Sequence, residues 1–575
     1  MKALPGKDNN YPMTIPLFII IFPLLAAVLI GFFGERMKSH VARVGVVATA
    51  SAFFISVSTL YQVSTQGPVH IMLWPLDSGG ASVFKLGLLI DRLTAVMMVL
   101  ITSVSTVIHV YSIRYLEGDS GYIRFFALLS FITFVILSLV SSSNLFMLFV
   151  FWSLLSWALY LILVFNYSHP DARKNAFKTF IVHRVGDVCF LFGIFLAYRY
   201  FGTLEFSELF RAARQTQTIS LLPGNILDVN AVSVISLLIF VGAMAKSAQF
   251  PLHVWLPDTM DSPTPVSALM HAGIVNAGGF LLNRLAPFYA LSPTTLHVVF
   301  LIGVLTVLLG ASMMLVQNDI KKTLGFSTMG QMGYMIMECG LGAFALAIFH
   351  LIAHGLFKAT LFLRAGQGIH DARDEPEFPH ESEHEPVRAP NQLSWYTGLI
   401  LTLIMPLIIL MVAHDVLDVP LKDANGAVIF LFFAWVTASQ AMFSLYRLHP
   451  VGSWAVVSAM IGSLFFIVFV YLWAGEAFTH FIYHEPGVAA GFFKAAAFNP
   501  KVFDMLVLLA TLLIIFGWVV IYTNSRGQSV FMKSWVVSIR NHMYILLVNR
   551  FYLDLFYVRC GSNLLRWAQK VAHRF

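Results

Sequence analysis

Residues 348–363 read IFHLIAHGLFKATLFL, an apolar stretch that contains His350, His354 and Lys358. The apolar run around it is about 20 residues long, the length that an α-helix needs to cross the hydrocarbon of a membrane. A spacing of four residues places the three side chains on one helical face. A single buried histidine is more often a packing residue, but three ionisable groups on one face of a membrane helix predict a functional site, because each is costly in hydrocarbon.

The composition extends this interpretation to the whole chain. Of 575 residues, 58% are hydrophobic and 11% are charged, whereas a soluble domain carries about 25% charged residues. Apolar blocks recur along the sequence and predict an all-α polytopic membrane protein of about 15 transmembrane helices. The expected spans lie near residues 13–33, 42–62, 90–112, 124–142, 144–165, 178–200, 232–252, 264–285, 296–316, 323–341, 343–363, 394–413, 427–446, 455–474 and 503–522.

The loops between these spans alternate in their content of Lys and Arg. Those near residues 35–43, 169–178, 319–322 and 446–447 are basic, whereas 64–82 and 475–500 are poor in basic residues. The positive-inside rule therefore predicts an N-terminus outside and a C-terminus in the cytoplasm.

The C-terminal tail, residues 526–575, carries most of the excess positive charge. It contains eight Lys and Arg residues and one acid, Asp554, interleaved with apolar residues. This pattern predicts an amphipathic helix at an anionic membrane surface, as a topology anchor or a binding segment. Nucleic-acid binding is not expected, because no recognised module accompanies the charge.

Further ionisable residues lie inside apolar runs, namely Asp187, Lys246, His271 and Glu338. Burial disfavours the charged form of Lys246, and a nearby carboxylate, for which Asp187 is the best candidate, favours it. A change in that carboxylate would then switch the lysine between holding and releasing a proton, and histidines could pass the proton on. The alternative is a static ion pair that orients two helices.

Two of the expected spans are interrupted by proline. Pro251 cannot donate to the carbonyl of Ser247, so the helix is expected to break beside Lys246. Pro406 interrupts a later span that ends at His414, and the repetition suggests an inverted repeat. Transporters place their ion sites at such broken helices.

No motif in the sequence predicts a catalytic centre, a metal site or a cofactor. The three cysteines have no CxxC spacing, and no nucleophile elbow or phosphate-binding loop is found. Residues 370–385 contain seven acids and three histidines. Metal binding is the sharper interpretation of this loop, but a solvated cytoplasmic loop is favoured because the spacing matches no standard site.

Four stretches closely resemble the proton-conducting antiporter-like subunits, a family that includes the largest membrane-arm subunit of respiratory complex I and the large subunit of Mrp sodium/proton antiporters. They are NAFKTFIVHRVGDVCF (175–190), KSAQFPLHVWLPDTMDSPTPVSALMHAG (246–273), NDIKKTLGFSTMGQMGYM (318–335) and IFHLIAHGLFKATLFL (348–363). The resemblance implies two inverted five-helix repeats, each with one broken helix.

The same resemblance implies roles for the buried residues. Lys246 is the central lysine of the first half-channel, Asp187 its tuning carboxylate and His271 the link to the second half, whose relay is His350, His354 and Lys358. The implied organisation is flanking helices in 1–112, half-channels in 113–290 and 291–450, C-terminal helices in 451–525 and the basic tail in 526–575.

Two positions depart from the family pattern. Ser153 follows Trp152 where the family has a membrane glutamate, and His414 replaces the terminal lysine of the second half. With these departures, the chain resembles the DabB-like subunits of dissolved-inorganic-carbon transporters of the bacterial inner membrane. That resemblance implies a cytoplasmic DabA-like partner, a zinc protein resembling β-carbonic anhydrase, which proton flow would energise.

Three hypotheses follow from the sequence. The first is a proton-translocating subunit of an inorganic-carbon uptake complex, without its own catalytic site. The second is a subunit of a complex-I-like redox pump or of an Mrp-type antiporter, and the third is a membrane anchor with relic charges. Protons are favoured as the coupled ion because Lys and His relays carry them readily, whereas Na⁺ prefers oxygen ligands.

Overall fold

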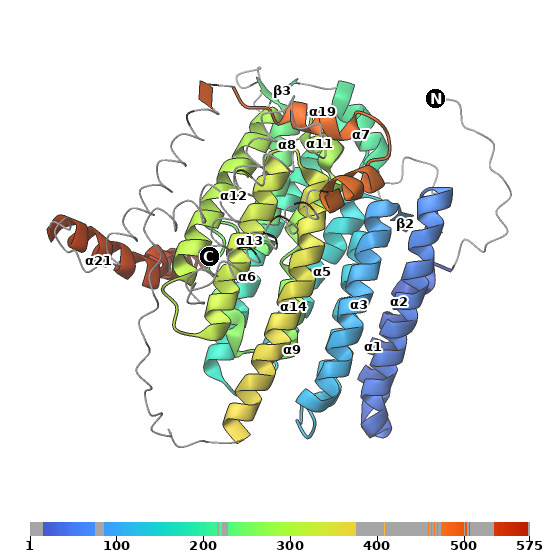
Figure 1. Ribbon diagram of the computed structural model, residues 1–575, viewed down its shortest axis with the longest axis vertical. Helices are drawn as coiled ribbons and strands as arrows, with labels where there is room; N and C mark the ends of the chain where they lie inside the picture. Colours follow the sequence, from blue (N-terminus) through green and yellow to red (C-terminus); the bar gives the residue numbers. More distant parts are fainter. Residues whose placement is uncertain are drawn as a thin grey trace. The chain divides into compact units, whose positions relative to one another are not determined.

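The computed structural model describes residues 15–74, 86–215, 218–220, 228–374, 473–499 and 534–572, with a few further residues between 408 and 505 (Figure 1). The chain divides into two compact units. The first contains Met1–Ser292, Ile302–Met335 and His350–Ile369, and the second contains Pro293–Leu301, Ile336–Phe349 and His370–Phe575.

Nine helical runs in the described part of the chain are long and apolar enough to cross a membrane. They are α1 (Leu17–Met37), α2 (Val41–Gln66), α3 (Arg92–Tyr115), α4 (Tyr122–Val140), α5 (Leu145–Leu163), α6 (Pro170–Phe201), the run Thr264–Arg284, α12 (Pro293–Met314) and Phe344–Gly366 within α14 (Phe344–Asp374). Two further expected spans coincide with α8 (Ala231–Lys246) and α13 (Ile320–Gly340). The spans expected beyond residue 390 lie wholly or largely outside the described residues.

Polar side chains cap several of these helices at the ends where the sequence turns apolar. The side chains of Asp91, Asn144 and Asn230 accept hydrogen bonds from main-chain N–H groups three residues later, over 2.9, 2.8 and 3.0 Å. Such caps satisfy donors that the helix itself leaves open. The starts of α3, α5 and α8 are therefore encoded locally.

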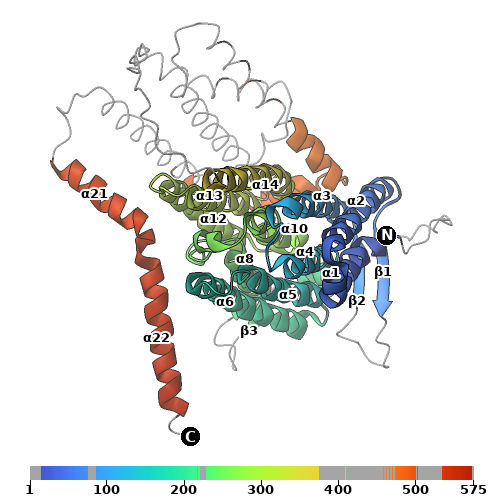
Figure 2. The same cartoon turned by 90° about the horizontal axis from the view of Figure 1, so that it is seen from below.

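In the first unit, α5, α6 and α8 lie side by side (Figure 2). Glycines permit the close contact of α6 with α8, because a Cβ atom on Gly186 would collide with the side chain of Ala245. Ala245 directly precedes Lys246, so the close crossing of these helices places α6 beside the lysine.

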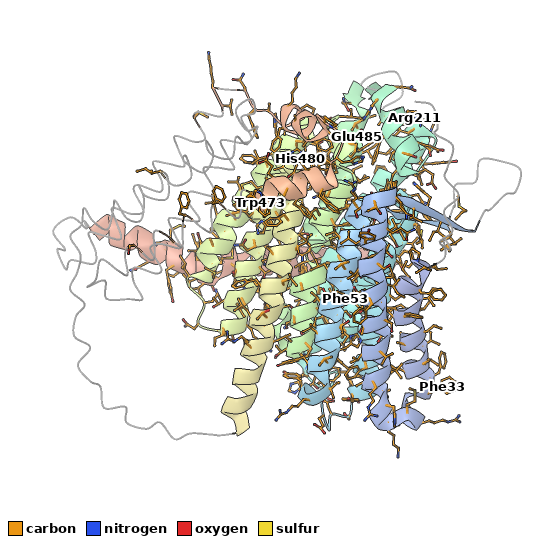
Figure 3. All side chains as sticks on the ribbon, turned by 45° about the vertical axis from the view of Figure 1, so that its right-hand side comes forward. Phe33, Phe53, Arg211, Trp473, His480 and Glu485 are labelled. Atoms are coloured by element: carbon orange, nitrogen blue, oxygen red, sulfur yellow. The ribbon has the colours of Figure 1, made fainter. Side chains whose placement is uncertain are left out.

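The outward faces of the spanning helices are apolar. Phe33 of α1, labelled in Figure 3, is 47% exposed, and Phe54 of α2 and Val188 of α6 are more exposed still. Exposed apolar side chains on helices of this length form a surface suited to lipid.

Helix α8 ends at Lys246, as the position of Pro251 predicts. Residues 247–255 form turns rather than helix, and a short 3₁₀ segment, η2 (Leu256–Asp261), follows. The indole N–H of Trp255 donates to the main-chain oxygen of Ala245 over 2.9 Å. This contact satisfies one of the carbonyl groups that the broken helix leaves open.

The following span, Thr264–Arg284, has a second irregularity that the sequence did not predict. Between α9 (Thr264–Leu269) and α10 (Ala277–Arg284), residues Met270–Ile274 form a π-helical turn, closed by Val275 N–H donating to Met270 O over 3.0 Å. Single π turns of this kind occur often at functional sites. His271 lies within it.

Short strands and small helices complete the described chain. The strands β1 (Val69–Trp74) and β2 (Leu86–Ile90) pair antiparallel, as do β3 (Thr218–Ser220) and β4 (Asp228–Asn230). The small helices are η1 (Lys38–His40), α7 (Phe206–Gln215), α11 (Ala286–Tyr289), α19 (Val488–Ala495) and η6 (Arg550–Tyr552).

The second unit contains the ends of three long helices together with α19. The ring of Phe344, at the start of α14, meets the ring of Phe492 in α19 edge to face, with 5.3 Å between their centroids. In the basic tail, the structure contains α21 (Ser534–Val548) and α22 (Leu553–Ala572). The tail is thus helical over most of its length, as expected.

Candidate functional site

Lys246 is buried at the end of α8, and its side chain has no exposed surface. Its Nζ donates to the main-chain oxygen of Trp152 over 2.7 Å and to the hydroxyl of Ser156 over 2.6 Å, and it lies 4.9 Å from the centroid of the Trp152 ring. A buried ammonium group is costly unless it is hydrogen-bonded. Helix α5 therefore supplies the environment that holds this cation.

Asp187 forms its ion pair with Arg184, one turn earlier on α6, over 2.6 Å. Arg184 also donates to the hydroxyl and to the main-chain oxygen of Ser153, over 2.8 and 3.2 Å. The carboxylate that the sequence assigns to Lys246 therefore lies on the neighbouring helix but is held by an arginine. The side chain of Asp187 is 6% exposed, so its charge is also buried.

Ser153 and Ser156 occupy the face of α5 where the family resemblance places an acid. Ser153 accepts from Arg184, and Ser156 accepts from Lys246. Neutral hydroxyl groups of α5 thus contact the two cations, and Asp187 of α6 is the acid of this cluster. These five polar side chains, Ser153, Ser156, Arg184, Asp187 and Lys246, form one cluster between α5, α6 and α8.

His271 is fully buried in the π turn. Its ring stacks on the ring of Phe362 in α14, with 4.4 Å between centroids and an interplanar angle of 13°. Neither ring nitrogen has a hydrogen-bond partner in the protein. Gly355 of α14 lies close to Ala272, since a Cβ atom there would be 3.0 Å from the oxygen of Ala272. His271 therefore meets α14 directly.

The stripe on α14 faces α13. His350 Nε2 lies 2.8 Å from the side-chain oxygen of Gln331, and Lys358 donates to the hydroxyl of Ser327 over 2.8 Å. Between them His354 is buried, with no hydrogen-bond partner in the protein at either ring nitrogen. His350 and Lys358 therefore share a face of α14 that contacts polar side chains of α13.

Two of the predicted relay residues, Glu338 and His414, do not belong to the part of the first unit described above. Glu338 is fully buried near the end of α13 and belongs to the second compact unit. His414 lies outside the described residues.

Comparison with known proteins identifies the family. A family model described as "NADH:quinone oxidoreductase/Mrp antiporter, TM" matches residues 142–421, and one for the N-terminus of complex I chain 5 matches residues 76–126. The "Probable inorganic carbon transporter subunit DabB1" of Halothiobacillus neapolitanus is 39% identical over 560 residues, which cover 96% of this chain and 98% of that protein. The chain belongs to the NADH:quinone oxidoreductase/Mrp antiporter family of membrane subunits.

Other relatives of this antiporter-family subunit are longer proteins. NADH-quinone oxidoreductase subunit L of Neisseria meningitidis serogroup B is 38% identical over 68% of this chain but only 58% of its own length. The fold is similar to that of the Mrp complex of Dietzia sp. DQ12-45-1b, with a TM-score of 0.56 at 22% identity over 97% of this chain and 63% of the compared chain. It is also similar to a membrane-bound sulfane sulfur reductase, with a TM-score of 0.56 at 20% identity, covering 88% and 96% of the two chains.

Several residues of the site in this antiporter-family fold were not predicted from the sequence. Ser156 carries no signal of its own, because a serine in a helix is common, whereas the three-residue spacing of Arg184 and Asp187 could have indicated their ion pair. Ser327 and Gln331 could have been found, since they repeat on α13 the spacing of the α14 stripe. In the described part of the chain no three His, Cys, Asp or Glu side chains gather closely enough to hold a metal ion.

Proposed function

We propose that this subunit conducts protons through the membrane along a buried relay of Asp187, Lys246, His271, His354 and Lys358. The observation that carries the proposal is the pair of buried lysines with histidines beside them whose ring nitrogens have no protein partner. Such nitrogens in buried sites generally bind ordered water. Hydrated imidazoles can accept and release protons near neutral pH.

The first step concerns the charge of Lys246. With Asp187 held by Arg184, the cation depends on the carbonyl of Trp152 and the hydroxyl of Ser156. If Asp187 turned from Arg184 toward Lys246, it would stabilise the charged lysine, and its return to Arg184 would favour release of the proton. The alternation of one carboxylate between two cations is thus a switch for proton loading.

The second step passes the proton from Lys246 toward α14. Ser247, the residue after Lys246, donates to the main-chain oxygen of Val275 over 2.5 Å, which ties the broken helix to the segment that holds His271. His271 in turn stacks against α14 one turn beyond Lys358. Water is needed between these groups, because no direct hydrogen bond joins His271 to His354 or Lys358.

The relay continues along α14. Lys358, His354 and His350 follow one another at four-residue spacing, which is about 6 Å of rise along the helix. Glu338 and His414 would extend the path into the second half of the chain. Protons suit this donor set better than Na⁺ does, since Na⁺ prefers a cage of oxygen ligands.

We further infer that proton flow serves the uptake of inorganic carbon. Support comes from similarity along nearly the whole length to a relative named as an inorganic carbon transporter subunit. The partner would be a DabA-like cytoplasmic subunit that binds zinc and resembles β-carbonic anhydrase. The basic loops support an N-terminus outside and a C-terminus in the cytoplasm of a bacterial inner membrane.

The experiment is to purify the complex from its native membrane and to measure uptake of labelled bicarbonate by the same cells. Co-purification of a zinc-containing cytoplasmic protein, with uptake that a protonophore abolishes, supports the proposal. A complex that instead contains flavin or quinone-binding subunits, or that exchanges Na⁺ for protons, would assign the chain to the second hypothesis.

A further inference from the structure

His183 is a buried histidine that the relay described above does not use. It lies on α6, directly before Arg184 and one turn before Asp187, and none of its surface is exposed. Neither ring nitrogen has a hydrogen-bond partner in the protein. The ring packs edge to face on Trp255, with 4.7 Å between centroids. An imidazole with both nitrogens free of protein contacts is not explained by packing alone, because a phenyl ring would fill the same site.

On one side of His183 lies a partly exposed ion pair. Lys178, five residues earlier on α6, donates to Asp258 of η2 over 2.7 Å, and the two side chains are 24% and 18% exposed. Five residues correspond to about 7.5 Å along the helix. Asp258 follows Trp255 by three residues, so the partner of Lys178 and the ring beneath His183 belong to the same short segment. This pair forms the water-accessible end of the site.

On the other side lies the buried cluster. Asp187 is four residues later on α6, about 6 Å along the helix axis, and Gly186 touches Ala245 next to Lys246. Trp255, on which the ring of His183 packs, also donates to the oxygen of Ala245. His183 is therefore placed between the exposed pair and the charges that surround Lys246.

We propose that His183 is the proton-transfer group between Lys246 and the water at the end of the membrane where α6 begins. This inference rests on the proposed proton conduction and adds one of its two outlets. One ring nitrogen takes a proton from water beside Lys178 and Asp258, and the opposite nitrogen gives its own proton to Asp187. Return of the ring to its first tautomer completes the cycle, which runs equally well in reverse.

The charged and titratable groups around the ring are compatible with this role. The groups carried near the ring by α6 and by the elements that contact it are Lys178, Arg184 and Asp187 on α6, Lys246 on α8, and His253 and Asp258 in the segment after α8. The two carboxylates lie one toward each end of the proposed path. A proton on the imidazole can therefore move to either carboxylate. The nearby cations disfavour the positively charged, doubly protonated ring.

The test compares His183→Phe and His183→Asn with the parent chain, each in the complete native complex reconstituted in liposomes. Phenylalanine keeps the packing on Trp255 and cannot carry a proton. We expect both variants to assemble normally and to lower proton flux at least about tenfold, since positioned proton-transfer groups commonly contribute about 10²–10⁴-fold. A smaller variant, His183→Ala, should regain part of its flux when imidazole is added, which a packing role would not allow.

Two controls keep the outcomes separate. His169→Asn alters an exposed histidine at the start of the same helix and should leave flux unchanged, because asparagine is a favourable cap. Lys246→Met tests the proposed conduction itself. If Lys246→Met abolishes flux while His183→Phe keeps it within about twofold of the parent, the role of His183 is wrong and the conduction stands. If Lys246→Met leaves flux intact, the conduction proposal fails first.

Discussion

The ammonium group of Lys246 and the carboxylate of Asp187 lie on two helices in close contact, yet each is bound to a different partner. Lys246 donates to the oxygen of Trp152 and to Ser156 on α5, and Asp187 pairs with Arg184 on its own helix α6. Each of the two opposite charges therefore has neighbours of its own that bind it. We propose that a short side-chain movement exchanges one pairing for another.

Removal of Arg184 should let Asp187 turn to Lys246. In Arg184→Gln the carboxylate loses its partner, and an ion pair with the lysine would stabilise the charged form. We expect proton flux in reconstituted complex to fall about tenfold, the effect of about 1.4 kcal/mol on a rate. Arg184→Lys, which keeps the charge, is the control and should retain most of the flux. Equal flux in parent and Arg184→Gln would show that the Arg184–Asp187 pair has no part in the switch.

An acid restored on α5 should compensate for the loss of the acid on α6. Ser153 lies against Arg184, so the carboxylate of Ser153→Glu would reach the same cation. We expect Asp187→Asn alone to lose most of its flux and the double variant Ser153→Glu with Asp187→Asn to conduct about tenfold more than that single variant, a coupling within the range seen for residues in contact. Flux assays on all three variants decide this. Additive losses would contradict it.

Substitution of His354 should affect proton flux much more than it affects the stability of the fold. His354 has no hydrogen bond to lose to the protein, so His354→Asn should lower the free energy of unfolding by about 1 kcal/mol, the typical effect of a single substitution. Its proton flux should nevertheless fall at least about tenfold. Thermal unfolding in detergent and flux in liposomes measure the two effects. A variant that conducts normally would remove His354 from the relay.

The ion pair of Asp91 with Arg284 is predicted to be structural and dependent on pH. Burial raises the pKa of Asp91, but the charge and hydrogen bonds of Arg284, with those of Thr94, outweigh it and hold the pKa below its ordinary value. The stabilisation is therefore complete above the ordinary carboxyl range and is lost as pH falls through the folded-state pKa. Asp91→Asn keeps the helix cap and leaves the buried guanidinium without its partner.

We expect Asp91→Asn to lower the free energy of unfolding near neutral pH by about 1.5–3 kcal/mol, the range for hydrogen bonds to charged groups. The difference between the variant and the parent should shrink on acidification. Thermal unfolding at several pH values measures it, and a difference that grows toward acid pH would contradict this explanation.

Much of this arrangement follows from the sequence, and the limits have physical causes. Apolar length predicts the spans, four-residue spacing predicts the face of α14, and Pro251 predicts the break beside Lys246. The partners of Lys246 do not follow, because Trp152 and Ser156 are about 90 residues away in sequence and an internal serine is an unremarkable residue of a membrane helix. Arg184, by contrast, lies only three residues before Asp187, a helical spacing at which an ion pair can be expected.

The π turn was not predicted from the sequence, and several predictions for the later part of the chain remain predictions. The π turn around His271 packs against α14 and leaves no periodic signal in the sequence. The inverted repeats, the half-channel boundaries at residues 113, 290 and 450, and the role of His414 remain predictions, since residues 375–450 lie almost wholly outside the described residues.

Proton flux through Lys246→Met in the reconstituted complex tests the central claim most directly. The measurement imposes a pH difference across liposomes and follows the interior pH with a trapped dye. Methionine fills a similar volume and cannot hold a proton, so we predict that flux falls at least about 100-fold while the complex assembles normally. Flux equal to that of the parent would contradict proton conduction through Lys246.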